Sequence, residues 1–153
     1  MPDPKTNMEM QRQDRLQALD LLVGIWTTRG VTIATENEPA VGFSGTDSYE
    51  WIEGGHFLLH RVDVEMGGTP VVGVEIIGYD ASSGAYRTSF MDVAGNATAY
   101  EARLVGREWT MASATDRFAG TFAIDGKSMA GRWQRKRANG DWAPWMDMTL
   151  TKP

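Results

Sequence analysis

The stretch Leu22-Val23-Gly24-Ile25-Trp26 marks a change in the periodicity of the chain. Before it, apolar residues recur at a spacing near 3.6, which is typical of an amphipathic helix. After it, short runs alternate between apolar and polar residues, which indicates half-buried β-strands. Gly24 is suited to end a helix, because glycine readily adopts the conformation that helix ends require. The sequence therefore predicts one N-terminal helix followed by an all-β fold.

The expected helix covers residues 8–23, and residues 1–7, which hold two prolines and no apolar pattern, are expected to be a flexible tail. Leu16, Leu19 and Val23 follow one another at i, i+3 and i+7, so they share one face of the helix. We expect this apolar face to cap one end of the β-structure.

Ten alternating segments follow the helix, separated by turns such as Asp125-Gly126 and Asn139-Gly140, which suit tight hairpins. The expected strands are 25–35, 41–52, 56–66, 71–79, 85–93, 97–104, 108–113, 117–124, 128–137 and 143–152. A meander of this length removes its unpaired edges by closing on itself, so we expect an up-and-down antiparallel barrel. A two-sheet sandwich is the alternative, which the even spacing of the hairpins disfavours.

The composition indicates one globular domain, residues 8–153, and excludes several classes of function. The chain of 153 residues has a net charge of -5, with 42% hydrophobic and 23% charged residues. The acidic balance argues against nucleic acid or a membrane surface as a partner. Cysteine is absent, which excludes disulfides and thiolate metal sites. The polar N-terminus shows no secretory signal, so we expect a cytoplasmic location.

The segment Gly24-Ile25-Trp26 after the helix resembles the Gly-x-Trp motif of the calycin superfamily, which includes lipocalins and fatty-acid-binding proteins. The resemblance implies a calycin-like barrel whose tryptophan seals one end, with a basic side chain from the last strands stacked across it. Trp26 matches the tryptophan. Either Arg132 or Arg135 matches the basic residue, as a cation over an aromatic ring. The resemblance therefore implies that these residues form a structural plug.

Other segments resemble one uncharacterised bacterial family of lipocalin-like proteins more closely, the domain of unknown function 1579. These segments are 51–59, 76–80, 84–92 and 139–142, and the resemblance covers about residues 16–151. The family implies a lipocalin-like barrel with a pocket and no established reaction. Nitrobindin-like barrels hold haem through a histidine late in the chain, and no histidine follows His60 here, so we expect no cofactor.

Side-chain alternation along the third expected strand decides which of its faces can point inward. Leu58 and His60 share one face, whereas Arg61, Asp63 and Glu65 share the other. Burying unpaired charges would cost several kcal/mol per ion, so we expect the face with His60 to line the interior.

His60 and Glu75 are the candidates for catalytic residues. An interior His60 is either a hydrogen-bonded structural histidine or a ligand contact and proton carrier. Glu75 interrupts an apolar strand and either points to solvent or lies in the lumen, where it would form an acid/base pair with His60. His56 and His60 are too far apart along a strand to bind one metal ion, so no metal site is expected.

Aromatic residues are abundant, with six Trp, four Tyr and five Phe, and ten strands enclose more volume than side chains alone fill. We therefore expect an apolar pocket with few polar groups, as small-molecule sites usually have. The other interpretation is that most aromatic side chains fill the core. The predicted ligand-binding residues are Tyr49, Trp51, Leu58, His60, Glu75, Tyr86, Phe90, Tyr100, Trp109, Phe122 and Trp133.

Three hypotheses for the function follow from this pattern. The first is binding of a small hydrophobic or aromatic molecule without any reaction. The second is a small barrel enzyme of the isomerase or cyclase type, in which His60 and a carboxylate or tyrosine move a proton. The third is a protein-interaction module, for example a homodimer. Polar groups in a roomy lumen would favour the second hypothesis over the first. A lumen filled with side chains, beside an exposed apolar patch, would favour the third.

Overall fold

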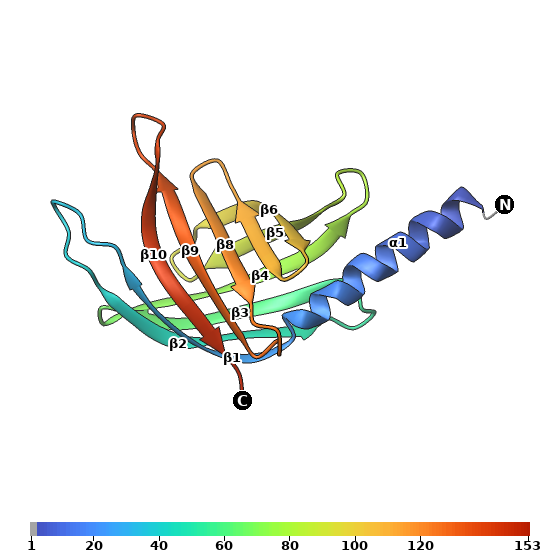
Figure 1. Ribbon diagram of the computed structural model, residues 1–153, viewed down its shortest axis with the longest axis horizontal. Coiled ribbons are helices and arrows are strands. Elements are labelled where there is room, and N and C mark those ends of the chain that lie inside the picture. Colours follow the sequence, from blue (N-terminus) through green and yellow to red (C-terminus); the bar gives the residue numbers. More distant parts are fainter. Residues whose placement is uncertain (1–2) are drawn as a thin grey trace.

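Ten antiparallel strands form a closed barrel in the computed structural model, which describes residues 3–153 (Figure 1). Each strand pairs with its neighbours in the chain, and the first strand also pairs with the last. The strands are β1 (Gly24–Thr32), β2 (Gly42–Trp51), β3 (Phe57–Met66), β4 (Thr69–Asp80), β5 (Ala85–Asp92), β6 (Ala97–Val105), β7 (Glu108–Ala112), β8 (Asp116–Phe122), β9 (Ser128–Lys136) and β10 (Trp142–Thr151). The predicted barrel is confirmed, and the two-sheet sandwich is wrong because the pairing runs without interruption around all ten strands.

The N-terminal helix begins and ends earlier than the sequence pattern predicts. It comprises α1 (Pro4–Ala18), which is followed by a short 3-10 turn, η1 (Leu19–Leu21). The carboxylate of Asp3 accepts a hydrogen bond from the backbone N–H of Lys5 at 3.1 Å, and Pro4 occupies the first helical position. A capping aspartate followed by proline is a common helix start. Proline has no N–H, but at the first helical position that N–H would have no partner within the helix.

The prediction of a flexible tail over residues 1–7 is therefore wrong for residues 4–7, which are helical. Residues 1 and 2 lie outside the described residues. In the part of the chain that the structure describes, the helical segments are too short or too polar to span a lipid bilayer.

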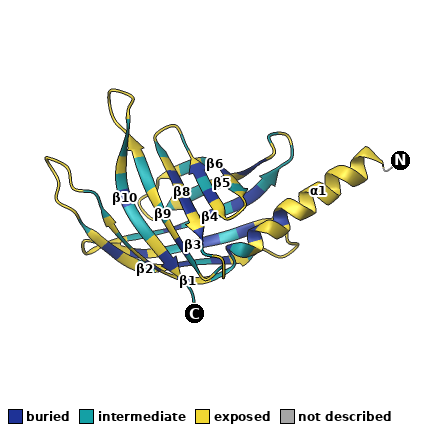
Figure 2. Cartoon of the chain, in the orientation of Figure 1, coloured by how far each residue is buried: buried dark blue, intermediate teal, exposed yellow. Residues whose placement is uncertain are grey.

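The helix caps the barrel only through its last turn and the residues that follow it. Most of α1 projects away from the barrel and is exposed (Figures 1 and 2). Within α1 only Leu16 is buried, whereas Leu19 and Leu22 are fully buried in the adjoining end of the barrel. The hydroxyl of Tyr86 donates to the backbone carbonyl of Arg15 at 2.5 Å and ties the two parts together. This end of the barrel is termed the helix end.

Trp26 fills the helix end as a buried plug. Only 1% of its surface is exposed, and its indole N–H donates to the carbonyl of Leu22 at 2.7 Å. Its ring lies 6.0 Å from that of Phe122, centroid to centroid. The position of Trp26 directly after the helix therefore joins the cap to the barrel.

The basic residue over Trp26 is Lys152, so the expectation that Arg132 or Arg135 takes this place is wrong. The Nζ atom of Lys152 lies 4.5 Å from the centroid of the Trp26 ring. It also donates to the carbonyl of Val23 at 3.0 Å. Lys152 directly follows β10, whose end pairs with β1 beside Trp26, and this proximity explains the contact.

Both arginines are engaged elsewhere on the barrel. Arg132 is on the outer surface, where its guanidinium group donates to the carboxylate of Asp147 at 2.6 and 2.9 Å. Arg135 lies toward the far end of β9, with its guanidinium 3.5 Å from the centroid of the Trp145 ring. Neither side chain reaches the helix end. Arg132 points outward because side chains alternate along β9, and Arg135 lies near the opposite end of that strand.

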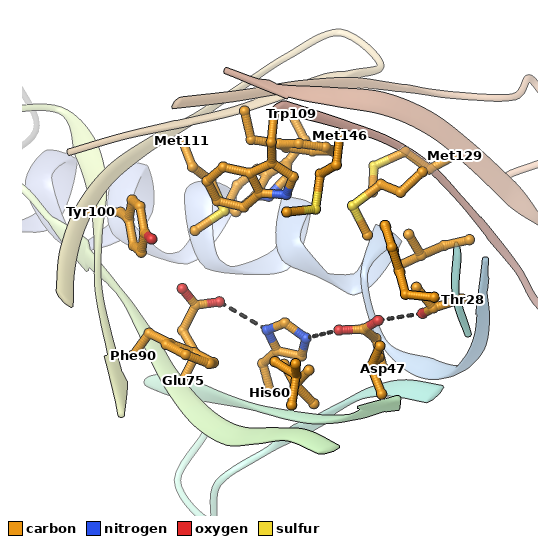
Figure 3. A pocket seen from close by; sticks show the side chains of 18 of the residues that line it. Thr28, Asp47, His60, Glu75, Phe90, Tyr100, Trp109, Met111, Met129 and Met146 are labelled. Carbon is orange, nitrogen blue, oxygen red and sulfur yellow. Dashed lines mark hydrogen bonds and ion pairs between the residues drawn. The ribbon is translucent and has the colours of Figure 1, made fainter. Parts of the chain in front are cut away.

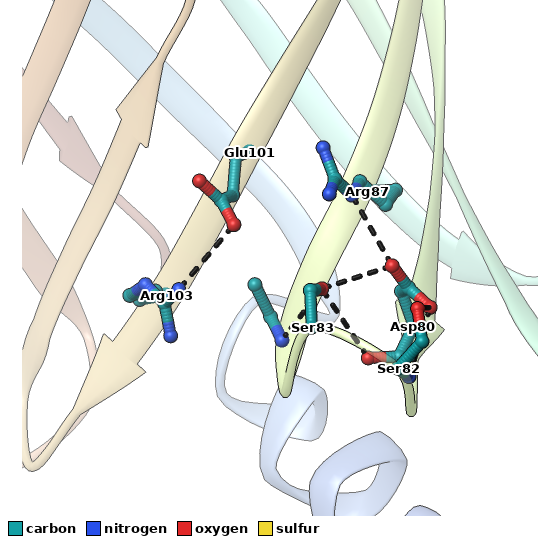
Figure 4. A network of polar contacts seen from close by, with 7 residues as sticks. Asp80, Ser82, Ser83, Arg87, Glu101 and Arg103 are labelled. Carbon is teal, nitrogen blue, oxygen red and sulfur yellow. Dashed lines mark hydrogen bonds and ion pairs between the residues drawn. The ribbon is translucent and has the colours of Figure 1, made fainter.

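The hairpin between β4 and β5 is closed by the side chain of Asp80 (Figure 4). Its carboxylate accepts hydrogen bonds from the hydroxyls of Ser82 and Ser83 at 2.7 and 2.9 Å, and Arg87 approaches it at 3.4 Å. The bonds from Ser82 and then Ser83 lower the pKa of Asp80 to about 2. This polar turn lies on the outside of the barrel and does not contribute to the lumen.

Gly45 lies where β2 and β3 approach too closely for a side chain. A Cβ atom at Gly45 would lie 2.1 Å from the carbonyl oxygen of Asp63, whereas one at Gly42 on the same strand would meet nothing within 4 Å. We expect Gly45→Ala to lower the free energy of unfolding by about 1–3 kcal/mol, because one strand must shift. Gly42→Ala is the matched control and should be nearly neutral. Urea denaturation measures both variants, and equal midpoints would contradict the close approach.

Candidate binding site in the barrel lumen

A cavity of about 320 Å³ lies inside the barrel, beyond the side chains that fill the helix end. Along the inner face of β3, Leu58 belongs to the packed core, and His60, Val62 and Val64 then line the cavity in turn. The lining continues to Met66, next to the β3–β4 turn. The cavity therefore extends toward the end of the barrel opposite the helix.

Four polar side chains on the wall of this cavity, Thr28, Asp47, His60 and Glu75, form one hydrogen-bonded row (Figure 3). Thr88 extends the row beyond Glu75, and the five residues together are here termed the polar chain. Thr28 donates to one carboxylate oxygen of Asp47, and the other lies 2.6 Å from Nε2 of His60. Nδ1 of His60 lies 2.9 Å from Oε1 of Glu75, and Thr88 donates to Oε2 of Glu75 at 2.8 Å. Each of the five residues is more than nine-tenths buried.

The register of neighbouring strands brings these side chains together. His60 on β3 is the direct partner of Glu75 on β4, so the two side chains point to the same face. Asp47 is the next inward position on β2, diagonal to His60. Thr28 and Thr88 come from the next strands on either side, β1 and β5. The polar chain thus spans five adjacent strands of the barrel.

His60 carries the positive charge of the polar chain. Burial disfavours the charged imidazolium, but hydrogen bonds to Asp47 and Glu75, together with their negative charges, outweigh it. The net effect raises the pKa of His60 from 6.5 to about 9. Near neutral pH, His60 is therefore protonated and donates one N–H to each carboxylate.

Two tyrosines next to the polar chain stay protonated and neutral. The ring of Tyr49 stacks on the imidazole of His60, with centroids 4.0 Å apart and planes inclined by 9°. Burial, and then the charges of Asp47 and Glu75, raise the pKa of Tyr49 well above 10. Burial, followed by nearby carboxylates, raises the pKa of Tyr100 to about 12. The phenol groups are thus neutral hydroxyls throughout the physiological pH range.

The structure divides the predicted ligand-binding residues into two groups. Those that line the cavity are Tyr49, His60, Glu75, Phe90, Tyr100, Trp109 and Trp133. Those that do not line it are Trp51, Leu58, Tyr86 and Phe122. Three of the second group pack in the core of the helix end, and the indole N–H of Trp51 donates to Asp20 near the helix at 2.7 Å. Alternation placed Leu58 on the inward face of its strand, but it does not tell how far along the lumen the plug extends.

Glu75 lies inside the lumen, so the interpretation that it points to solvent is wrong. On β3 the structure agrees with the expectation from alternation, because Arg61, Asp63 and Glu65 are exposed. His56 is exposed in the turn before β3 and lies away from His60. Across residues 3–153, no three His, Asp or Glu side chains are grouped in a way that would hold a metal ion.

Sequence reasoning did not select Asp47, Thr28 or Thr88 as site residues. Asp47 is two residues from Tyr49 on the same strand face, so alternation could have identified it together with that tyrosine. Methionines were also missed, although five of the nine in the chain line the cavity: Met66, Met111, Met129, Met146 and Met148. Methionine is flexible and polarizable, so these side chains give the cavity an adaptable wall.

Comparison with known proteins identifies a family and a fold. The family model described as "Protein of unknown function (DUF1579)" matches residues 11–152. The crystal structure of Rv2717c from M. tuberculosis is similar, with a TM-score of 0.61 and 13% identity over 91% of this chain and 97% of that chain. A de novo designed fluorescence-activating β-barrel gives a TM-score of 0.47 and 17% identity over 89% of this chain and 97% of that chain. No curated protein matches the chain.

Proposed function

Since this chain belongs to DUF1579, a family of proteins of unknown function, we propose a function from the lumen itself: the barrel binds a small hydrophobic or aromatic molecule. The observation that carries the proposal is the cavity of about 320 Å³, which is lined mainly by aromatic, aliphatic and methionine side chains. An unfilled apolar cavity forfeits packing contacts along its whole lining, so a ligand of matching shape is stabilised there.

The polar chain supports recognition of one polar group on such a ligand. Asp47, His60 and Glu75 are the only charged side chains among the described residues that line the cavity. Most of the remaining wall offers apolar contact, and a few precisely placed polar groups in an apolar pocket usually orient a small molecule. A ligand with one polar end and an apolar body therefore suits the cavity best.

Polar groups do lie in a roomy lumen, as the isomerase or cyclase hypothesis expects, but their mutual hydrogen bonds leave that alternative with weaker support. A general base needs an accepting atom directed at its substrate. Both ring nitrogens of His60 are engaged by Asp47 and Glu75, so the imidazole has no free nitrogen to accept a proton from a substrate. This arrangement holds the row in place and favours binding over proton transfer. The interaction-module hypothesis predicts a lumen filled with side chains. The cavity argues against that hypothesis.

A neutral fluorescent dye tests the proposed function. N-phenylnaphthylamine fluoresces strongly in apolar surroundings and accepts energy from tryptophan. Trp109, Trp133 and Trp145 line the cavity, so binding there should quench tryptophan emission while dye emission rises. We expect saturable binding by the folded protein. A titration without saturation, or without energy transfer, would contradict a binding site in the lumen.

Neighbouring valines on the two faces of the barrel wall provide a matched pair of variants. Val62 and Val71 line the cavity, whereas Val72 and Val74 alternate with the inward positions of β4 and do not line it. The double variant Val62→Phe/Val71→Phe should weaken dye binding about tenfold or more, because it fills the cavity. The double variant Val72→Phe/Val74→Phe adds the same atoms outside and should bind like the wild type. Equal loss in both would point to a general effect on folding instead.

A further inference from the structure

The polar chain carries a net negative charge that no lining residue of the cavity compensates. Two N···O contacts, from His60 to Asp47 and from His60 to Glu75, each hold one proton. One imidazolium between two carboxylates leaves the three residues together with one negative charge.

Among the described residues that line the cavity, none is Lys or Arg, so no basic side chain of this lining faces the charge. The outer ends of the polar chain are the hydroxyls of Thr28 and Thr88, which donate hydrogen bonds but carry no charge. Near the far end of the barrel, Arg135 stacks on Trp145 and approaches Asp116 at 3.8 Å, so it has a carboxylate of its own. A buried charge without a counter-ion is unfavourable, and an entering cation would relieve it.

Aromatic rings face the carboxylate at one end of the polar chain. Figure 3 shows Phe90 and Tyr100 beside Glu75, with Trp109 across the cavity. Phe90 is the direct partner of Glu75 between β4 and β5, which fixes its ring next to the carboxylate. The faces of aromatic rings attract cations, and the attraction strengthens where water is excluded. The carboxylate and the rings therefore favour the same kind of group.

We propose that the ligand of this lumen is an organic cation, an amine with an aromatic or alkyl body, whose ammonium group lies at Glu75 among Phe90, Tyr100 and Trp109. This inference rests on the proposed function and adds the chemical class of the ligand. The ammonium N–H groups donate to Glu75, whose oxygens each accept only one hydrogen bond within the polar chain. The apolar body of the amine then lies among the methionine and aromatic side chains of the remaining wall.

Three probes that share a naphthalene ring and differ in one group test this inference. Naphthylmethylamine is a cation near neutral pH, naphthylmethanol is neutral and naphthoate is an anion. Calorimetric titration of the wild-type protein should show the amine binding about tenfold more tightly than the alcohol, with naphthoate the weakest. An amine that binds no better than the alcohol would overturn the inference, while the binding function would stand. If neither these probes nor N-phenylnaphthylamine binds, both proposals are wrong.

Two glutamine variants locate the preference within the lumen. Glu75→Gln removes the charge at the proposed ammonium position and should bring the affinities for amine and alcohol within about threefold of each other. Glu65→Gln removes an exposed carboxylate from the neighbouring strand and should keep the wild-type preference. Equal preference in both variants would place the ammonium elsewhere and overturn the assignment to Glu75. If Glu75→Gln does not fold, Asp47→Asn removes the same net charge from the polar chain and takes its place in the comparison.

Discussion

Replacing Trp26 by alanine is expected to lower the free energy of unfolding by about 3–5 kcal/mol, the usual range for deleting a buried large aromatic side chain. The indole is almost completely buried in the core of the helix end, where Phe122 packs against it. The substitution also leaves the carbonyl of Leu22 without its donor and removes the ring beneath Lys152. The cap and the barrel would then lose one of the contacts that join them.

Denaturant titration followed by circular dichroism measures this loss, and Trp142→Ala is the matched control. Trp142 also has a cationic partner, with the Arg117 guanidinium 4.3 Å from its ring centroid, but it is only partly buried. Trp142→Ala should lower the free energy of unfolding by well under half as much as Trp26→Ala. An unchanged denaturation midpoint for Trp26→Ala would contradict its role as a plug.

The stability of the barrel is expected to fall as the pH rises from about 6.5 to about 9, through the titration of His60. The pKa of His60 is about 9 in the folded protein, where Asp47 and Glu75 hold the proton against the cost of burial. In the unfolded chain the pKa returns to the ordinary value of 6.5. Because the folded pKa is the higher one, the stabilisation is complete below pH ~6.5 and is lost as the pH passes through the folded pKa. The stabilisation that His60 contributes is ~3 kcal/mol at most, which is the free energy that a pKa difference of this size represents.

Urea titrations at several pH values test this dependence, with variants of the two histidines as the comparison. His60→Gln should be less stable than wild type at pH 6 and should lose the decline between pH ~6.5 and ~9 that His60 causes. His56→Gln removes the exposed histidine and should retain the decline. If His60→Gln does not fold, an NMR titration of the His60 imidazole in the wild-type protein measures its pKa directly. A titration midpoint near 6.5 in the folded protein would refute the charged, doubly bonded state.

Part of the polar chain was within reach of sequence reasoning. Alternation along β3 placed His60 inside, because the opposite face carries three charges. The two-glycine turn Gly67-Gly68 makes Met66 and Thr69 direct partners. Six residues farther from the turn on each strand, His60 therefore lies opposite Glu75. A short hairpin turn sets the register of both its strands, so this contact was predictable in principle.

The sequence by itself determined the ten strands, their hairpin turns and the inner face of β3, because these depend on neighbours in the chain and on local periodicity. Only the tertiary structure decided that Lys152 covers Trp26, that α1 projects outward, and where the plug ends and the cavity begins. The contact of Lys152 depends on the closure of β10 against β1, which joins the two ends of the sheet. The cavity depends on the summed volumes of inward side chains from all around the barrel, and no local segment of the sequence contains that sum.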